Sequence, residues 1–156
     1  MTPAIEMLRE LGIAHTIAAY DHDPARGSYG DEAVEALGLD PESVFKTLMV
    51  TLDDGSFAIG VVPVGAQLDL KAIAAAAGAK KAVMTDSAEA QRRSGYVLGG
   101  ISPFGQKRPA RTFVDEWAGA LAIVHCSGGR RGLEIGVAPS AFVDALGATF
   151  AAIAAW

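Results

Sequence analysis

The fold is decided by residues 44–62, which read VFKTLMVTLDDGSFAIGVV. Val44–Leu52 and Phe57–Val62 are apolar, and both alternate well enough to predict β-strands. The residues between them, Asp53-Asp54-Gly55-Ser56, are typical of a tight turn. The sequence therefore predicts a β-hairpin here, the clearest in the chain.

Before the hairpin, local signals predict two helices and one strand. Thr2 and Pro3 are typical of a helix start, because Thr accepts a backbone hydrogen bond as N-cap and Pro has no N–H to lose. Gly12 follows this helix and is typical of its end. The other predicted elements on this side are a strand at Ala14–Tyr20, a loop at Asp21–Gly30 and a helix at Asp31–Leu37.

After the hairpin, helices and strands interleave. Asp69 and Asp86 are typical N-caps, and the four glycines and one proline of Gly95–Gly105 exclude regular structure there. Thr149–Trp156 fits a strand or a helix, since its alanines favour neither strongly. The other predicted elements are helices at Leu70–Ala77, after Asp86 to about Arg93 and at Pro139–Leu146, and strands at Ala82–Met84, Thr112–Asp115, Leu121–Cys126 and Leu133–Val137.

These elements predict the fold class. Several strand connections are tight hairpins, so a mixed sheet with helices packed around it is favoured over a doubly wound parallel fold. The length of 156 residues suits one domain, residues 1–156, and a hydrophobic content of 51% is enough to bury a core. The sequence therefore predicts a single mixed α/β domain.

The charge distribution bears on possible partners. The net charge of −5 argues against a general nucleic-acid binder. Residues 1–60 carry a net charge of −8, whereas the rest of the chain carries +3. Because gripping only the end of an RNA needs few phosphate contacts, this balance permits binding of a tRNA end without indicating it.

The sequence contains few features that indicate a cellular compartment. The single cysteine, Cys126, cannot form an intrachain disulfide, and no apolar stretch approaches the roughly 20 residues that a bilayer requires. The first residues lack the basic flank and long apolar run of a signal peptide. We therefore expect a cytoplasmic protein without a membrane segment.

Lys46 is the first candidate for a functional side chain, because it interrupts an apolar strand. The pattern alone favours a lysine that faces solvent on an alternating strand. The functional alternative is a lysine directed into a cleft, where it would hold a phosphate or polarise a carbonyl. The alternation does not decide between them.

Two glycine-rich loops are the next candidates. Gly99–Gly105 could bring backbone N–H groups close to an anion or a carbonyl, or could be a plain turn. Ser127–Gly132 contains two arginines that suit phosphate contacts, although a solvated hairpin loop explains them equally well. Neither loop has the Gly-Lys-Ser/Thr ending of a phosphate-binding P-loop.

The sequence offers no conventional catalytic set. His125 and Cys126 are adjacent, but neighbours on a strand point to opposite faces, so Cys126 is predicted to be a buried core thiol. Asp21-His22-Asp23 is weak evidence for a metal site, because no second cluster of His or Cys supports it. We expect no metal and no cofactor.

Taken together, several motifs resemble one known family. The stretches that carry the resemblance are Tyr20–Pro24, Lys46–Leu48, Gly65–Lys71, Gly95–Pro103 and Ser127–Leu133. They resemble the YbaK family, the bacterial Cys-tRNA(Pro) deacylases, which are related to the editing domain of prolyl-tRNA synthetase. The similarity covers nearly the whole chain in order, and the combination is specific although each piece alone is weak.

The resemblance implies a fold and a site. The implied fold is a mixed α/β domain with a curved, barrel-like sheet surrounded by helices. The implied catalytic residues are Lys46, Gly99, Gly100, Ile101 and Ser102. The implied substrate-binding residues are Tyr20, Tyr29, Lys46, Pro103, Ser127, Gly128, Gly129 and Arg130. Tyr29 stands where phenylalanine is expected, and His125-Cys126 is an unusual pair for the family.

The resemblance also implies a mechanism that needs no protein nucleophile. The thiol of the attached cysteine would attack its own ester carbonyl, and the protein would position the ester and stabilise the oxyanion. The implied partners are the acceptor end of tRNA(Pro) and prolyl-tRNA synthetase. Two alternatives remain open: a deacylase for Ala-tRNA(Pro) or another small amino acid, and a non-catalytic module that binds a tRNA end or a nucleotide.

Overall fold

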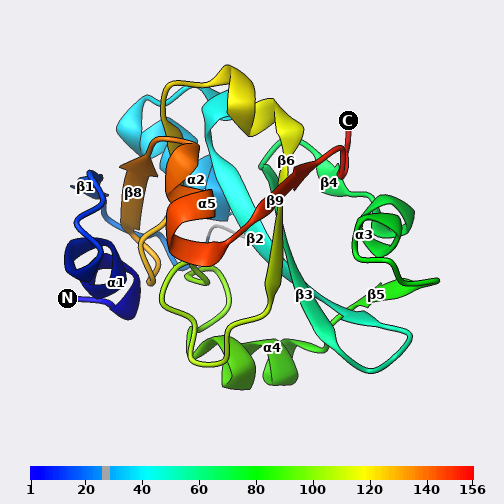
Figure 1. The fold of residues 1–156 in the computed structure, drawn as a ribbon. Coiled ribbons are helices and arrows are strands. Elements are labelled where there is room, and N and C mark those ends of the chain that lie inside the picture. Colours follow the sequence, from blue (N-terminus) through cyan, green and yellow to red (C-terminus); the bar gives the residue numbers. More distant parts are fainter. Residues whose placement is uncertain (26–28) are drawn as a thin grey trace.

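The computed structural model describes residues 1–25 and 29–156, and of Tyr29 it describes only the backbone. Its centre is the predicted hairpin, formed by β2 (Phe45–Leu52) and β3 (Phe57–Pro63) (Figure 1). The two strands pair antiparallel, and Gly55 in the turn has φ 86°, a value that favours glycine. The hairpin prediction is confirmed.

The hairpin belongs to a mixed five-stranded sheet with the order β5-β2-β3-β6-β9. The strands added to it are β5 (Ala82–Met84), β6 (Arg111–Asp115) and β9 (Thr149–Ala151). β5 runs antiparallel to β2, whereas β6 runs parallel to β3 and β9 parallel to β6. The predicted mixed sheet is therefore confirmed.

A second, antiparallel sheet has the order β1-β8-β7. Its strands are β1 (Thr16–Ala19), β8 (Leu133–Val137) and β7 (Val124–Ser127). A single parallel bridge between Val44 and His125 links it to the start of β2. A third sheet pairs β10 (Ala154–Ala155) with β4 (Gln67–Leu68), so the C-terminal segment forms strands rather than a helix.

Two expectations about the sheets need correction. The described strands form three separate sheets, not a closed barrel, because only the isolated Val44–His125 bridge joins the two larger ones. In addition, β7 begins at Val124 and not at Leu121. Residues 121–123 belong to no strand and follow a 3₁₀ helix at Glu116–Ala120, which the Asp115 carboxylate caps by accepting a hydrogen bond from the Trp117 N–H.

Five α-helices surround the sheets (Figure 1), with a 3₁₀ helix at Pro41–Ser43 before β2. They are α1 (Pro3–Glu10), α2 (Tyr29–Leu37), α3 (Leu70–Ala76), α4 (Ser87–Ser94) and α5 (Ser140–Leu146). Thr2 and Asp69 cap α1 and α3 with their side chains, as predicted. Asp86 occupies the N-cap of α4 but makes no side-chain capping bond, and α2 starts two residues earlier than predicted.

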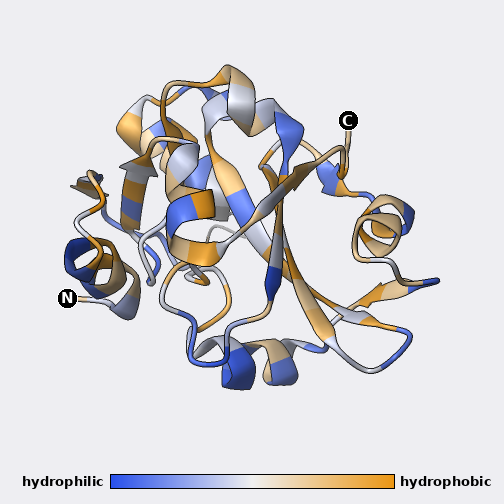
Figure 2. Cartoon of the chain, in the orientation of Figure 1, coloured by the Kyte–Doolittle hydropathy of each residue, from blue (hydrophilic) through white to orange (hydrophobic). Residues whose placement is uncertain are grey.

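The apolar core lies on both faces of the five-stranded sheet. One cluster joins Phe45 and Met49 of β2 to α1, α5 and the inner face of the three-stranded sheet. The other joins Val50 and Leu52 of β2 to α3 and Ile153. Figure 2 shows the apolar residues along β2 and β3, with hydrophilic residues on the outer sides of α1 and α4. In the described part of the chain, no helix is long and apolar enough to cross a bilayer.

Candidate active site

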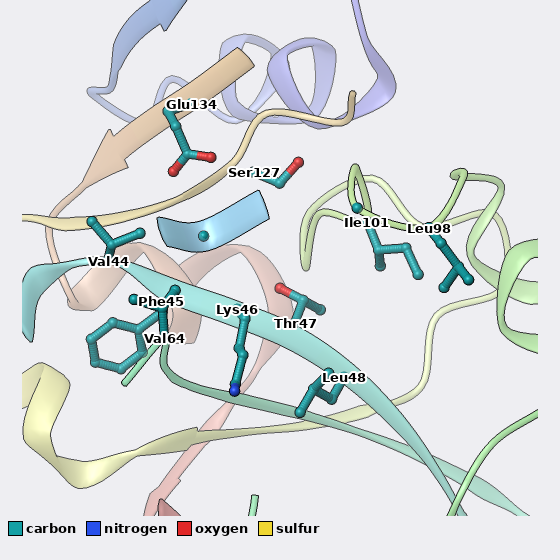
Figure 3. Close-up of a pocket in the computed structure, with 12 residues that line it drawn as sticks. Val44, Phe45, Lys46, Thr47, Leu48, Val64, Leu98, Ile101, Ser127 and Glu134 are labelled. Carbon is teal, nitrogen blue, oxygen red and sulfur yellow. The ribbon is translucent and has the colours of Figure 1, made fainter. Parts of the chain in front are cut away.

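A cavity of about 290 Å³ lies at the seam where β2 meets the three-stranded sheet (Figure 3). Its walls combine apolar side chains with one lysine, one glutamate and two hydroxyl-bearing residues. Its lining residues are Gly30, Val44, Phe45, Lys46, Thr47, Leu48, Val64, Leu98, Gly99, Ile101, Ser127 and Glu134. Its volume lies at the lower limit for small-molecule binding sites, which is about 300 Å³.

Strand alternation explains which side of each strand carries three of the polar lining residues. On β7 and β8, the core side is taken by Cys126 and Ile135, which leaves Ser127 and Glu134 on the outer side. These two residues are direct neighbours across the β7–β8 pair. On β2, Lys46 alternates with Phe45, which faces the main core, and so it also lies away from that core.

Lys46 lies half-buried at the cavity, and not on an open strand surface. Figure 3 shows its side chain leaving β2 on the side opposite to Thr47. Burial lowers the pKa of the Lys46 ammonium, and the negative charge of Asp31 on α2 opposes that shift. The placement favours the functional interpretation of this lysine, although it leaves the residue's role to be tested.

Glu134 is a cavity residue that the sequence analysis missed. Its exposed fraction is 7%, and burial raises the pKa of its carboxyl to about 8. Its Oε2 is buried without a hydrogen-bond partner among the described residues. The signal was present in the sequence, because Glu134 interrupts the apolar strand Leu133–Val137 just as Lys46 interrupts β2.

The predicted loop after α4 contributes to the cavity only in part. Leu98, Gly99 and Ile101 line it. Gly100 does not, and its N–H donates to the carbonyl of Val97 at 2.9 Å. A Cβ on Gly100 would lie 2.7 Å from the Cα of Arg130, so this glycine permits the loop to pack against the backbone after β7.

Ser102 and Pro103 are buried beside the loop and are not part of the cavity lining that the structure describes. The Ser102 hydroxyl accepts a hydrogen bond from the N–H of Phe104 at 3.3 Å, and its carbonyl accepts one from Gln106 at 3.0 Å. These contacts give Ser102 a role in holding the loop. The catalytic role implied by the resemblance finds no geometric support at its side chain.

The second glycine-rich loop meets the first at the cavity rim. Ser127 lines the cavity, and its hydroxyl accepts a hydrogen bond from the N–H of Gly129 at 3.1 Å. Gly128 and Gly129 instead pack against neighbouring side chains, and Arg130 is exposed. Arg131, which was not among the predicted site residues, donates from Nε to the carbonyl of Leu98 at 2.9 Å and so ties the two loops together.

The structure describes the two aromatic residues that were predicted to bind substrate, Tyr20 and Tyr29, to different extents. Tyr20 follows β1, and its N–H donates to the carbonyl of Gly132 at 2.9 Å. It is not one of the described residues that line the cavity, although burial and the charge of Glu134 raise the pKa of its phenol. The side chain of Tyr29 lies outside the described residues.

The remaining candidates have structural roles. Cys126 is fully buried in the core, and burial together with the Glu134 charge raises the pKa of its thiol well above the usual value. His125 lies on the opposite face, as predicted. His22 contacts Glu32 at 2.6 Å, and the described residues contain no group of three His, Cys, Asp or Glu that could hold a metal ion.

Comparison with solved structures supports the fold. The chain superposes with a TM-score of 0.84 on a structure provisionally described as a trans-editing enzyme for prolyl tRNA synthetase, at 20% identity, covering 100% of this chain and 99% of the other. It superposes with a TM-score of 0.86 on the hypothetical protein APE2540, at 22% identity, covering 97% and 99% of the two chains. At such identities these likenesses establish the fold alone.

Sequence comparisons establish the family. The aminoacyl-tRNA editing domain model matches residues 22–145. A protein of Enterococcus faecalis, provisionally named Cys-tRNA(Pro)/Cys-tRNA(Cys) deacylase EbsC, is 33% identical over 123 residues, which cover 79% of this chain and 75% of the relative. The chain therefore belongs to the aminoacyl-tRNA editing domain family, the YbaK family of aminoacyl-tRNA deacylases.

Proposed function

We propose that this protein is a trans-editing deacylase that removes cysteine from mischarged Cys-tRNA(Pro). The name of the 33% identical Enterococcus faecalis relative supports this substrate. The cavity supports it as well, because its volume of about 290 Å³ suits an aminoacyl group with the adjoining ribose better than a stem of RNA.

One observation carries the proposed chemistry: the chain's single cysteine is sealed in the core, on the face of β7 opposite to the cavity residue Ser127. A protein thiol is therefore not placed to attack the substrate. The attached cysteine carries its own thiol, which becomes a good nucleophile once it loses its proton near its usual pKa of about 8.5. The reaction then depends on positioning and on electrostatic stabilisation.

In the proposed reaction, the substrate thiol releases its proton and its sulfur bonds to the carbonyl carbon of the same residue's ester. The bond from that carbon to the ribose oxygen breaks, and the ribose oxygen takes up a proton from solvent. The products are free tRNA and a cyclic thioester, which water then opens to cysteine. Lys46 stabilises the oxyanion that develops on the carbonyl oxygen.

The test is a panel of tRNA(Pro) charged with cysteine, serine or alanine, assayed under single-turnover conditions with identification of the released product. Serine differs from cysteine by one atom and keeps its size, so we expect release at least tenfold faster from the cysteinyl ester than from the seryl ester. Equal rates for all three esters would remove the thiol from the mechanism and favour attack by water.

We further propose that prolyl-tRNA synthetase supplies the selection of tRNA. The net charge of −5 leaves the chain a weak attraction for the RNA backbone, so the acceptor end alone is recognised. Adding the synthetase should therefore increase the preference for tRNA(Pro) over a cysteinylated tRNA(Cys). A preference that is already complete without the synthetase would contradict this part.

A further inference from the structure

Glu134 is a buried acidic residue of the cavity, and the described residues around it do not explain its burial. It lines the cavity from β8, only 7% of its surface is exposed to solvent, and its Oε2 makes no hydrogen bond among the described residues. Burying a carboxyl group without a partner costs free energy, and an apolar residue of similar size would fill the site more stably. Such a group points to a ligand that completes it.

The described groups around Glu134 form no ion pair with it. Ser127 is its neighbour on β7, Tyr20 lies at the end of β1, and Lys46 lies on β2 at the same cavity. Cys126 is beside it on the core face. Among the described residues, no lysine, arginine or histidine forms an ion pair with Glu134, so its carboxyl is open to a cationic group of a bound molecule.

We propose that Glu134 binds the α-ammonium group of the aminoacyl ester and thereby orients the amino acid in the cavity. The proposal rests on the proposed function, because every aminoacyl-tRNA carries this amino group beside the ester carbonyl. An α-amino group at the end of a peptide has an ordinary pKa of about 7.7–8.0, and a neighbouring carboxylate favours the cationic form of such a group. It is also the one cation that a substrate places within a single carbon of the reacting carbonyl.

The polarity of the cavity agrees with this assignment. Lys46 on β2 and Glu134 on β8 are the two ionisable side chains of the described lining, and the apolar side chains of Val44, Val64 and Ile101 belong to it as well (Figure 3). A substrate with an ammonium group and a developing oxyanion carries one group of opposite charge for each of these two residues. The substrate's own side chain is then directed toward the apolar lining.

Binding should also move a proton. A cation beside the carboxyl favours its ionised form, and the free carboxyl is largely protonated at pH 7 because burial raises its pKa to about 8. Ligand binding at pH 7 should therefore release close to one proton to the buffer. A residue that merely fills space would release none.

The experiment measures binding of a non-hydrolysable probe, 3′-(L-cysteinyl)amido-3′-deoxyadenosine, and of its N-acetyl form, by titration calorimetry at pH 7 in two buffers of different ionisation enthalpy. For the parent protein we expect the N-acetyl probe to bind at least tenfold more weakly, and the free amine to release about one proton. Glu134→Gln should bind both probes with similar, weak affinity and release no proton. The exposed Glu10→Gln serves as the matched control and should behave as the parent.

Two results would overturn the assignment: a Glu134→Gln protein that still prefers the free amine tenfold, or a parent protein that does not distinguish the probes. Glu134→Asp, which keeps the charge, should recover part of the preference and guards against a loss caused by misfolding. The deacylation assay separates this inference from the proposed function. Preference for the amine without hydrolysis of any ester would refute only the function, whereas hydrolysis without preference would refute only the role of Glu134.

Discussion

Lys46 is the side chain on which the proposed chemistry depends most. It contributes a positive charge to the cavity from β2, and it does so at a half-buried position where burial lowers its pKa. We expect Lys46→Ala to reduce kcat/KM for Cys-tRNA(Pro) at least tenfold, which corresponds to about 1.4 kcal/mol of transition-state stabilisation. Lys46→Arg should also be impaired, since a planar guanidinium replaces a compact ammonium poorly in a tight site.

The control for this measurement is Lys80→Ala, which removes an exposed lysine from the turn before β5. It should retain the parental kcat/KM. A folded Lys46→Ala protein with parental activity would return Lys46 to a structural role and leave the oxyanion without a stabilising cation.

Cys126 is the residue whose loss should matter least to the chemistry. It is fully buried in the core cluster, with its thiol on the face opposite to Ser127. We expect Cys126→Ser to keep most of the single-turnover rate, with a loss of stability of about 1–3 kcal/mol from the buried hydroxyl. A folded variant that is slower by several orders of magnitude would show that a protein thiol participates.

At this scale, the sequence predicted one charged cavity residue and missed the other. Lys46 and Glu134 each interrupt an apolar strand, but a charged residue on an alternating strand usually faces solvent. What distinguishes them is the seam between two sheets, where the bridge from Val44 to His125 joins β2 to β7 and both residues line one cavity. That contact joins segments far apart in sequence, so local patterns cannot reveal it.

At the scale of elements, the site depends on the packing of two loops. Gly100 lets the loop after α4 approach the backbone after β7, because an added Cβ would lie 2.7 Å from the Cα of Arg130 and 3.0 Å from the N of Arg131. Backbone atoms cannot move away from an added Cβ as the end of a flexible side chain can. We expect Gly100→Ala to destabilise the fold by about 1–3 kcal/mol and to lower activity at least tenfold, by displacing Gly99 and Ile101 from the cavity.

Gly119→Ala is the matched control, since a Cβ there meets no atom within 4 Å. Its unfolding free energy from urea titration and its deacylation rate should stay near the parental values. Equal behaviour of the two alanine variants would mean that the close approach of the loops is not required.

The elements that the sequence predicted correctly are those whose signals are local. The turn at Gly55 and the caps Thr2 and Asp69 act within a few residues, and all three are present. The late start of β7 was not predictable in this way, because Leu121 and Ile123 are as apolar as the strand that follows, yet the pairing with β8 begins only at Val124. The C-terminal strands likewise depend on distant partners, β6 and β4.

At the scale of the whole molecule, the buried carboxyl of Glu134 should make folding stability depend on pH. Its pKa rises from 4.5 to about 8 on folding, so between these values the folded state keeps a proton that the unfolded state has lost. The free energy of unfolding should therefore fall as pH increases through this range, by about 1.4 kcal/mol per pH unit for one proton. Above pH 8 the effect should level off.

Glu134→Gln removes this titration and leaves the other groups in place. Urea unfolding of both proteins at pH 5, 6, 7 and 8 should show a stability advantage for Glu134→Gln that grows with pH. Parallel curves for the two proteins would show that the carboxyl is ionised in the folded state, which would contradict its isolation from solvent.

We propose that this protein removes cysteine, but not proline, from tRNA(Pro). The most direct measurement mixes Cys-tRNA(Pro) and Pro-tRNA(Pro), each with a different radiolabel on its amino acid, and follows both esters in one reaction with the protein. We expect the cysteinyl ester to disappear well above its spontaneous rate while the prolyl ester stays largely intact. Loss of both esters at equal rates, or no loss of the cysteinyl ester, would contradict it.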